Sequence, residues 1–189
     1  MIMRVITGTA RGRRLKTLKG LSQRPTADRV RESVFSMLGG QVIEADVLDL
    51  FAGTGSLGIE ALSRGARSAL FVDTSLQAKA IIDENLSLTN LRDRAEIWVS
   101  DSCQAVKRLQ RKGRRFHVIF ADPPYGLGLG SRTLHCLGSC DVLNPGGIFI
   151  LEHGPHEDLE GRAHSLEAVV EKTYGQTRVH VFQWICHKE

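Results

Sequence analysis

The sequence predicts an α/β fold with a doubly wound, mostly parallel sheet, a basic β-hairpin ahead of it and an antiparallel hairpin at one edge. Three observations predict this fold. From about residue 45, short apolar strand patterns alternate with helical patterns. Most of these strands carry few charges before their ends, as expected when helices cover both faces of a sheet. The last two strand patterns follow one another without a helix long enough to separate them, so we expect them to pair antiparallel.

The first 40 residues precede this alternation and predict two elements. Residues 1–22 have the pattern of two short strands around a glycine turn, which is a basic N-terminal β-hairpin. Residues 23–40 have the pattern of a helix with Thr26 as its N-cap. Its apolar positions fall at helical spacing, so we expect it to pack on the body of the protein and to place Arg29 and Arg31 elsewhere. The apolar positions are Val30, Val34, Met37 and Leu38.

Residues 45–189 contain the α/β core, and we interpret the whole chain, 1–189, as one domain. A chain of this size buries about 70% of its unfolded surface, which is enough for a core without disulfides or metals. A glycine-rich stretch at 126–130 predicts a loop, either a mobile lip that orders over a substrate or a plain flexible loop. The strand patterns lie at 46–51, 68–73, 95–101, 116–122 and 146–153, the helical patterns at 55–65, 76–90 and 102–113, and the edge hairpin at 166–174 and 177–186.

Composition excludes several classes of protein. No apolar run approaches the roughly 20 residues of a membrane span, and the first residues lead into no signal-like segment, so we expect a cytoplasmic protein without membrane contact. The four cysteines include no C-x-x-C pair, and the seven histidines are scattered without ligand spacing. We therefore expect free thiols and no metal.

Positive charge is concentrated near the N-terminus. Residues 1–31 hold nine Lys and Arg against the single acid Asp28, a net charge of +8, whereas the other 158 residues sum to −4 because the whole chain carries +4. Such asymmetry favours a nucleic-acid partner that supplies phosphate. A second basic cluster lies at 107–115. The alternative for both clusters is a solvated surface without a partner.

A glycine loop between a strand and a helix predicts a nucleotide-containing ligand. Gly53, Gly55 and Gly58 form G-x-G-x-x-G, and Asp73 closes the next strand 20 residues after Gly53, where it would hold ribose hydroxyls. A dinucleotide and S-adenosylmethionine both fit this pattern. Asp49, four residues before Gly53, favours S-adenosylmethionine. A carboxylate at this position suits the cationic amino-acid moiety of S-adenosylmethionine and does not suit a pyrophosphate.

Asp101 ends the next strand, where its carboxylate would accept from an adenine amino group. The alternative is an ordinary N-cap for the helix that follows. Three acids at three successive strand ends favour the sulfonium cofactor, S-adenosylmethionine, over a dinucleotide.

The strand at 116–122 exits into Asp122, Pro123, Pro124 and Tyr125. Two consecutive prolines must end the strand, because proline fixes φ and has no N–H for the sheet. Asp122 and Tyr125 are then held on a stiff corner beside the crevice where open α/β sheets bind ligands. A corner alone requires neither an acid nor an aromatic ring.

The glycine loop and this D-P-P-Y corner together resemble the signature of S-adenosylmethionine-dependent methyltransferases that act on planar amino groups. The segments "RVITGTARGRRLKT", "RPTADRVRESVFSML" and "LDLFAGTGSLGIEALSRGA" resemble the bacterial RsmD family, which modifies guanine N2 in 16S ribosomal RNA. The similarity runs from about Arg4 to the "LNPGGIFILE" strand. It implies a Rossmann-like class I methyltransferase fold, S-adenosylmethionine as cofactor, and 16S ribosomal RNA, within a small-subunit particle, as partner.

The residues of the D-P-P-Y corner suit methyl transfer to an exocyclic amine for physical reasons. An exocyclic amine on a base is a poor nucleophile because its lone pair is delocalised into the ring. Asp122 and the carbonyl of Pro123 can accept hydrogen bonds from that amine and free the lone pair, while Tyr125 stacks on the base. Positioning and charge then carry most of the rate.

The resemblance assigns roles residue by residue. Asp73 departs from the glutamate common at its position, which shortens the reach to the ribose by one carbon and keeps the chemistry. The catalytic set is Asp122, Pro123, Pro124 and Tyr125; the cofactor set is Asp49, Ala52, Gly53, Gly55, Asp73, Asp101 and Ser102; the RNA-binding set is Arg11, Arg13, Arg14, Lys16, Arg24 and Arg29. No metal is implied, and a monomer is expected because the basic segment needs free access.

Three alternatives stay open at this point. A DNA adenine-N6 methyltransferase shares the corner, although 189 residues leave little room for a separate target-recognition domain. A nicotinamide oxidoreductase shares the glycine loop but does not explain the D-P-P-Y corner. A catalytically silent assembly factor would use the basic segment to bind ribosomal RNA.

Overall fold

The computed structural model describes residues 3–17 and 25–185 and contains an eight-stranded sheet in the order β3-β2-β1-β4-β5-β8-β7-β6. Strands β1 to β5 are parallel, while β8 pairs antiparallel with β5 and β7 antiparallel with β8. The strands are β1 Asp46–Asp49, β2 Ser68–Asp73, β3 Ala95–Val99, β4 Phe116–Ala121, β5 Leu143–His153, β6 Arg162–Ala163, β7 Leu166–Tyr174 and β8 Thr177–Trp184. The predicted fold, with its parallel sheet and antiparallel edge hairpin, is confirmed.

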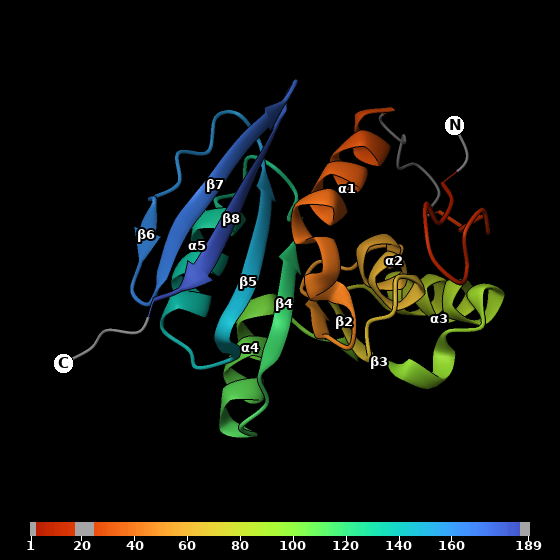
Figure 1. Ribbon diagram of the computed structural model, residues 1–189. Helices are drawn as coiled ribbons and strands as arrows, with labels where there is room; N and C mark the ends of the chain where they lie inside the picture. The colour runs from red at the N-terminus through yellow and green to blue at the C-terminus, as the bar shows by residue number, and fades with distance from the viewer. Residues whose placement is uncertain (1–2, 18–24, 186–189) are drawn as a thin grey trace.

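Helices cover both faces of this sheet (Figure 1). Successive residues of a strand point to opposite faces, so Val47 belongs to the core under α1, α2 and α3, and Leu48 to the core under α4 and α5. The helices are α1 Pro25–Leu38, α2 Ser56–Ser63, α3 Leu76–Thr89, α4 Ser102–Arg111 and α5 Leu129–Gly138, with short 3₁₀ turns η1 Gly39–Val42 and η2 Arg92–Arg94. None of the helices in the described residues is long and apolar enough to cross a membrane.

Helix α5 departs from the prediction, which placed a glycine-rich loop at 126–130 and no helix after it. The helix begins at Leu129, directly after Gly128 in a left-handed conformation (φ 65°). Only Leu134 and Leu137 supply large apolar side chains to the core, and glycines lie at both ends. Such a sparse set of apolar residues produces no clear helical periodicity in the sequence.

The basic N-terminal hairpin is present in a reduced form. One antiparallel bridge joins Arg4 to Arg14, and the amide of Leu15 donates to the carbonyl of Met3 at 2.9 Å. The Val5 amide donates to the Arg13 carbonyl at 3.0 Å, and the Gly12 amide donates to the Val5 carbonyl at 2.9 Å. Beyond Val5 the chain does not continue as paired strands, because the amides of residues 6, 7, 9 and 10 donate to α2. The residues that bury this segment in the core are Val5, Ala10 and Leu15.

Candidate active site

The strand order brings four acids to one edge of the sheet. Strands β3, β2, β1 and β4 are neighbours and parallel, so their carboxyl ends lie side by side. Asp73 and Asp49 are the last residues of β2 and β1, Asp122 directly follows β4, and Asp101 lies two residues after β3. Open parallel sheets bind ligands at this edge, which makes it the candidate active site.

The glycine loop turns tightly between β1 and α2. Gly53 and Gly55 have positive φ values of 54° and 80°, a conformation that favours glycine, and the Gly55 amide donates to the Ala52 carbonyl at 2.6 Å. Gly58 has a different purpose, because a Cβ there would lie 2.3 Å from the Phe71 ring. The third glycine of the motif therefore lets α2 pack closely on β2, and the first two shape the loop.

Asp73 is held against the glycine loop. Its Oδ2 accepts from the Gly53 amide at 2.8 Å, and its Oδ1 accepts from the Ser75 amide at 2.9 Å. Two backbone donors fix the carboxylate, and each oxygen keeps a further lone pair for a ligand hydroxyl. The 20-residue spacing in the sequence thus corresponds to a direct contact between the two ends of the motif.

Asp49 is buried with an incomplete set of partners. It is 1% exposed, and its Oδ2 accepts from the Gly58 amide at 3.1 Å. Its Oδ1 makes no well-formed hydrogen bond. Burial raises the pKa of Asp49 to about 7, a rise that the Gly58 hydrogen bond opposes. A cationic ligand group at this position would supply the partner that the carboxylate lacks, so the residues fit the predicted sulfonium cofactor.

Asp101 is the N-cap of α4, the alternative that its sequence context left open. Its Oδ1 accepts from the Gln104 amide at 3.1 Å and from Arg132 Nη2 at 3.2 Å. Ser102 follows it as a buried residue of the first helical turn. Both of these hydrogen bonds use the same carboxylate oxygen, so a contact of Oδ2 with a ligand stays compatible with the cap.

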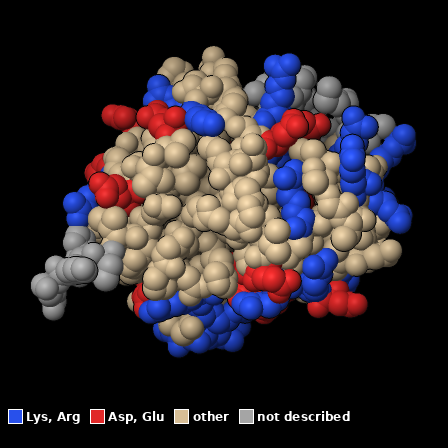
Figure 2. Space-filling model, viewed as in Figure 1, with Lys and Arg blue, Asp and Glu red and all other residues tan. Residues whose placement is uncertain are grey.

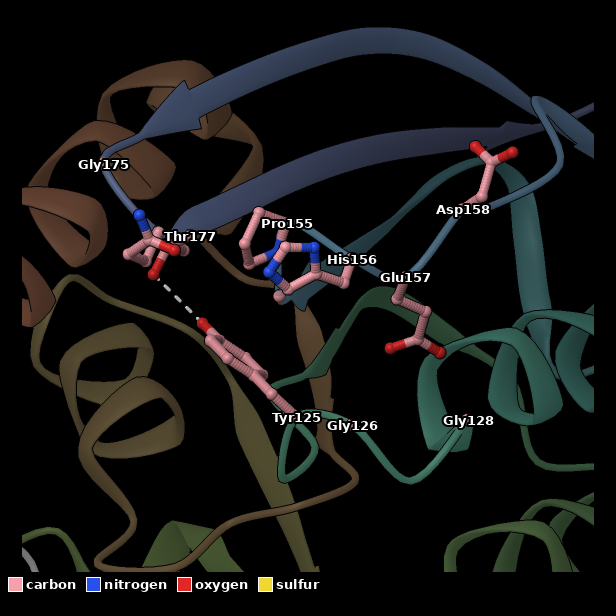
Figure 3. Close-up of a pocket in the computed structure, with 11 residues that line it drawn as sticks. Tyr125, Gly126, Gly128, Pro155, His156, Glu157, Asp158, Gly175 and Thr177 are labelled. Carbon is pink, nitrogen blue, oxygen red and sulfur yellow. Dashed lines mark hydrogen bonds between the residues drawn. The ribbon is translucent and has the colours of Figure 1, made fainter.

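Tyr125 is fixed at the corner after β4 by partners that the sequence did not reveal. Its hydroxyl donates to Glu152 Oε1 at 2.9 Å and lies 3.0 Å from Thr177 Oγ1 (Figure 3). A Cβ on Gly154 would lie 3.1 Å from the ring, so this glycine lets the ring approach β5. Burial, together with the Glu152 carboxylate, raises the pKa of Tyr125 above its ordinary value, and the phenol therefore stays protonated.

A cavity of about 900 Å³ opens beside Tyr125. Figure 3 shows the Tyr125 ring and His156 on its walls, with the loop around Gly126 and Gly128 below them. Glu157 joins two walls, because its Oε1 accepts from the Ser131 amide in α5 at 2.9 Å. The cavity is formed by the segments 125–128, 154–158 and 175–177, which are remote from one another in the sequence.

The predicted RNA-binding residues differ in their surroundings. Arg11, Arg13, Arg14 and Arg29 are exposed, and Lys16 is exposed and paired with Glu84. Figure 2 shows Lys and Arg gathered on the right of the displayed face, where Figure 1 places residues 3–17, the N-terminal segment. Arg24 lies outside the described residues.

Arg31 corrects the expectation that it points away from the body of the protein. Its side chain is only 4% exposed, and its Nη2 donates to the carbonyl of Arg4 at 2.7 Å and pairs with Asp28 at 3.1 Å. Arg31 therefore ties α1 to the N-terminal segment and does not present its charge to a partner. The helical pattern predicted an exposed Arg31 because it does not show that the N-terminal segment covers that side of α1.

The second basic cluster lies at the end of α4 remote from the acids. Lys107, Arg108, Arg111 and Lys112 are exposed, and Arg108 stacks 4.3 Å from the centre of the Trp98 ring. This region forms the lower end of the face in Figure 2.

In the part of the chain that the structure describes, Cys103, Cys136 and Cys140 are free thiols, and no group of three His, Cys, Asp or Glu residues could hold a metal.

Comparison with known proteins places these features in a family context. Residues 3–183 match the family model described as "Conserved hypothetical protein 95". The chain is similar to YlbH of Bacillus subtilis strain 168, with 36% identity over 96% of this chain and 98% of YlbH. It is 30% identical to "Ribosomal RNA small subunit methyltransferase D" of Escherichia coli K12, over 96% of this chain and 89% of that protein. The solved yhhF structure from Escherichia coli covers 97% of this chain and 98% of yhhF, with a TM-score of 0.85 and 32% identity.

Proposed function

This chain belongs to the RsmD family, whose model is described as conserved hypothetical protein 95, and we propose that it methylates the exocyclic N2 amine of a guanine in small-subunit ribosomal RNA. It is an RNA methyltransferase, and its cofactor is S-adenosylmethionine. The observation that supports transfer to a planar amine is the D-P-P-Y corner, which directly follows β4 beside the glycine loop and the acids of β1 and β2. The resemblance to the RsmD family supports guanine N2 of small-subunit ribosomal RNA as that amine.

The cofactor residues have complementary tasks. S-adenosylmethionine supplies an electrophilic methyl group when bound. Asp49 would hold its cationic amino-acid moiety, Asp73 would accept hydrogen bonds from the ribose hydroxyls, and Asp101 with Ser102 would bind the adenine. Ala52, Gly53 and Gly55 shape the turn that allows close approach. The support for this assignment is the partly unsatisfied Asp49 carboxylate and the positive φ values of the two glycines.

The corner prepares the amine for transfer. Asp122 and the carbonyl of Pro123 accept hydrogen bonds from its two N–H groups, which weakens delocalisation of the nitrogen lone pair into the base. Pro124 stiffens the turn, and the Tyr125 ring stacks on the base, an interaction worth about 1–3 kcal/mol. No strong general base would be needed, because the methyl group of the bound cofactor is already activated. The N–CH₃ bond would form as the S–CH₃ bond breaks, S-adenosylhomocysteine would be the leaving group, and the amine would release its proton to solvent during or after transfer.

The cavity beside Tyr125 suits an unstacked base better than a phosphate. Its described lining contains the carboxylates of Glu157 and Asp158 and no Lys or Arg. Acceptors of this kind match a guanine edge, which presents N1–H and N2–H₂ donors, and disfavour an anionic group. The exposed cations of the N-terminal segment lie elsewhere and are available for the RNA backbone.

The proposal is tested by identifying the methylated nucleoside. Small-subunit particles from cells lacking the endogenous enzyme are incubated with the protein and methyl-labelled S-adenosylmethionine, and the RNA is digested. We expect label in N2-methylguanosine, transferred by a monomeric enzyme. Naked 16S RNA and duplex DNA serve as comparison substrates. Label in another nucleoside would overturn the guanine assignment, and label in DNA alone would favour the adenine-N6 alternative.

A further inference from the structure

One buried side chain, Asn85 of α3, joins the N-terminal segment to the glycine loop. Asn85 is 0% exposed. Its Nδ2 donates to the carbonyl of Lys16 at 3.0 Å and to the carbonyl of Thr54 at 2.9 Å, while its Oδ1 accepts from the Lys16 amide at 2.7 Å. The amide therefore uses both donor hydrogens, and it pairs with the backbone of Lys16 as a neighbouring strand would.

Thr54 is the residue of the glycine loop that this contact restrains. It lies between Gly53 and Gly55, which have positive φ values and no side chains to anchor them. Its hydroxyl forms a second contact with the N-terminal segment, 3.4 Å from the sulfur of Met3. The two ends of the segment are thus both linked to Thr54. Met3 contacts Thr54 directly, and Lys16 is linked to it through Asn85.

The residues between Met3 and Lys16 form hydrogen bonds with α2, the helix that directly follows the glycine loop. The amides of Ile6 and Thr7 donate to the buried Glu60 carboxylate of α2 at 2.7 and 3.0 Å, and the Ala10 amide donates to Ser63 Oγ at 2.9 Å. If the segment moved away, Asn85 would keep Thr54 but lose two hydrogen-bond partners in a buried place, which is unfavourable. The docked segment and the observed loop conformation therefore stabilise each other.

We propose that Asn85 couples RNA binding by the N-terminal segment to cofactor binding at the glycine loop. This inference rests on the proposed function, because it takes RNA as the ligand of the segment and S-adenosylmethionine as the ligand of the loop. RNA that holds the segment docked also holds Thr54 in place, and cofactor that fixes the loop favours the docked segment. Linkage makes the effect reciprocal, with a coupling factor of about 5–150. Asn85 is a positioning residue that touches neither ligand.

The test measures the affinity for small-subunit particles with and without saturating S-adenosylhomocysteine. The full-length protein is sedimented with the particles, and the ratio of the two Kd values is the coupling factor. For the wild type we expect S-adenosylhomocysteine to tighten binding about 5-fold or more. The Asn85→Asp variant keeps an acceptor for the Lys16 amide but turns an oxygen toward two carbonyls. Its coupling factor should fall to about 1.

A second pair of variants leaves the buried residue intact. Lys16→Pro removes the backbone N–H that Asn85 binds, whereas Lys16→Met removes the same cation and keeps the N–H. We expect both to bind particles more weakly than the wild type and only Lys16→Pro to lose the coupling. A merely structural contact would lower thermal stability without changing the ratio. This pair decides the matter if Asn85→Asp does not fold.

Two results would overturn the coupling. One is a wild-type protein that methylates the particles with a coupling factor of 1, which leaves the proposed function intact. The other is an unchanged factor in Asn85→Asp or, where that variant does not fold, in Lys16→Pro. A wild-type protein that binds no ribosomal RNA would remove both the coupling and the proposed function.

Discussion

Asp49 links the stability of the folded chain to its affinity for the cofactor. Its carboxyl group has an ordinary pKa of 3.8 and a pKa of about 7 in the fold, because it is buried. The folded protein therefore binds more protons than the unfolded chain between these two values. In the absence of cofactor, stability falls as the pH rises through this window, because the buried group must ionise. A ligand cation compensates for that ionisation.

Asp49→Asn tests this trade-off. At about pH 8 we expect the cofactor-free variant to be more stable than the wild type by up to about 4 kcal/mol, and at about pH 4 to be similar, as thermal melts will show. The loss of the charge should weaken S-adenosylhomocysteine binding by roughly 10- to 100-fold in calorimetry. A variant that melts below the wild type at the higher pH would contradict the account of Asp49.

The same carboxylate predicts a pH dependence of cofactor binding. The ionised form attracts the cationic moiety, so the affinity of the wild type should weaken as the pH falls below about 7. Calorimetric titrations from about pH 8 to about pH 6 measure this, with Asp49→Asn as the control whose affinity stays flat. Equal pH profiles for the two proteins would show that another group is responsible.

Tyr125 separates the contribution of its ring from that of its hydroxyl. Tyr125→Phe keeps the stacking surface and removes the bonds to Glu152 and Thr177, so kcat/KM on particles should fall less than about tenfold. Tyr125→Ala also removes the ring and should cost about 5- to 150-fold, from a stacking energy of about 1–3 kcal/mol. If the two substitutions were equally harmful, the hydroxyl and not the ring would be the important group.

At the scale of the element, the N-terminal segment presents cations from a docked backbone. Replacing Arg11, Arg13 and Arg14 by Gln should weaken RNA binding and reduce the slope of log affinity against log salt by about 2–3, because each contact with a phosphate contributes about 0.7–0.9 to that slope. The matched control replaces Lys107, Arg111 and Lys112 of the second basic cluster. Equal reductions of the slope in both variants would indicate a diffuse electrostatic effect and not a defined contact.

Elements with clear periodicity were predictable, and elements fixed by tertiary contacts were not. The strand at 116–121 is indicated by a run of apolar residues that two prolines end. Helix α5 has few large apolar side chains and was expected to be a loop, since its position depends on packing under β5 to β7. The burial of Arg31 also depends on a contact with Arg4, which lies 27 residues away.

For the whole molecule, the sequence predicted which acids lie at the same edge of the sheet, but it did not predict the long-range contacts around them. Parallel strands with right-handed crossovers bring Asp49, Asp73, Asp101 and Asp122 to one edge by topology alone. The contacts of Tyr125 with Thr177 and of Asn85 with Lys16 join residues 52 and 69 positions apart. No local pattern encodes such pairs, so the cavity and the docking of the N-terminal segment required the structure.

In the proposed mechanism, Asp122 acts on the amine and not on the cofactor. A single-turnover reaction tests this role, with labelled S-adenosylmethionine, unmethylated small-subunit particles, and either the wild type or Asp122→Ala. Calorimetric titration of S-adenosylhomocysteine into both proteins accompanies it. We predict that the variant binds S-adenosylhomocysteine with nearly unchanged Kd and transfers no measurable methyl group. Methylation by Asp122→Ala at the wild-type rate would contradict the mechanism.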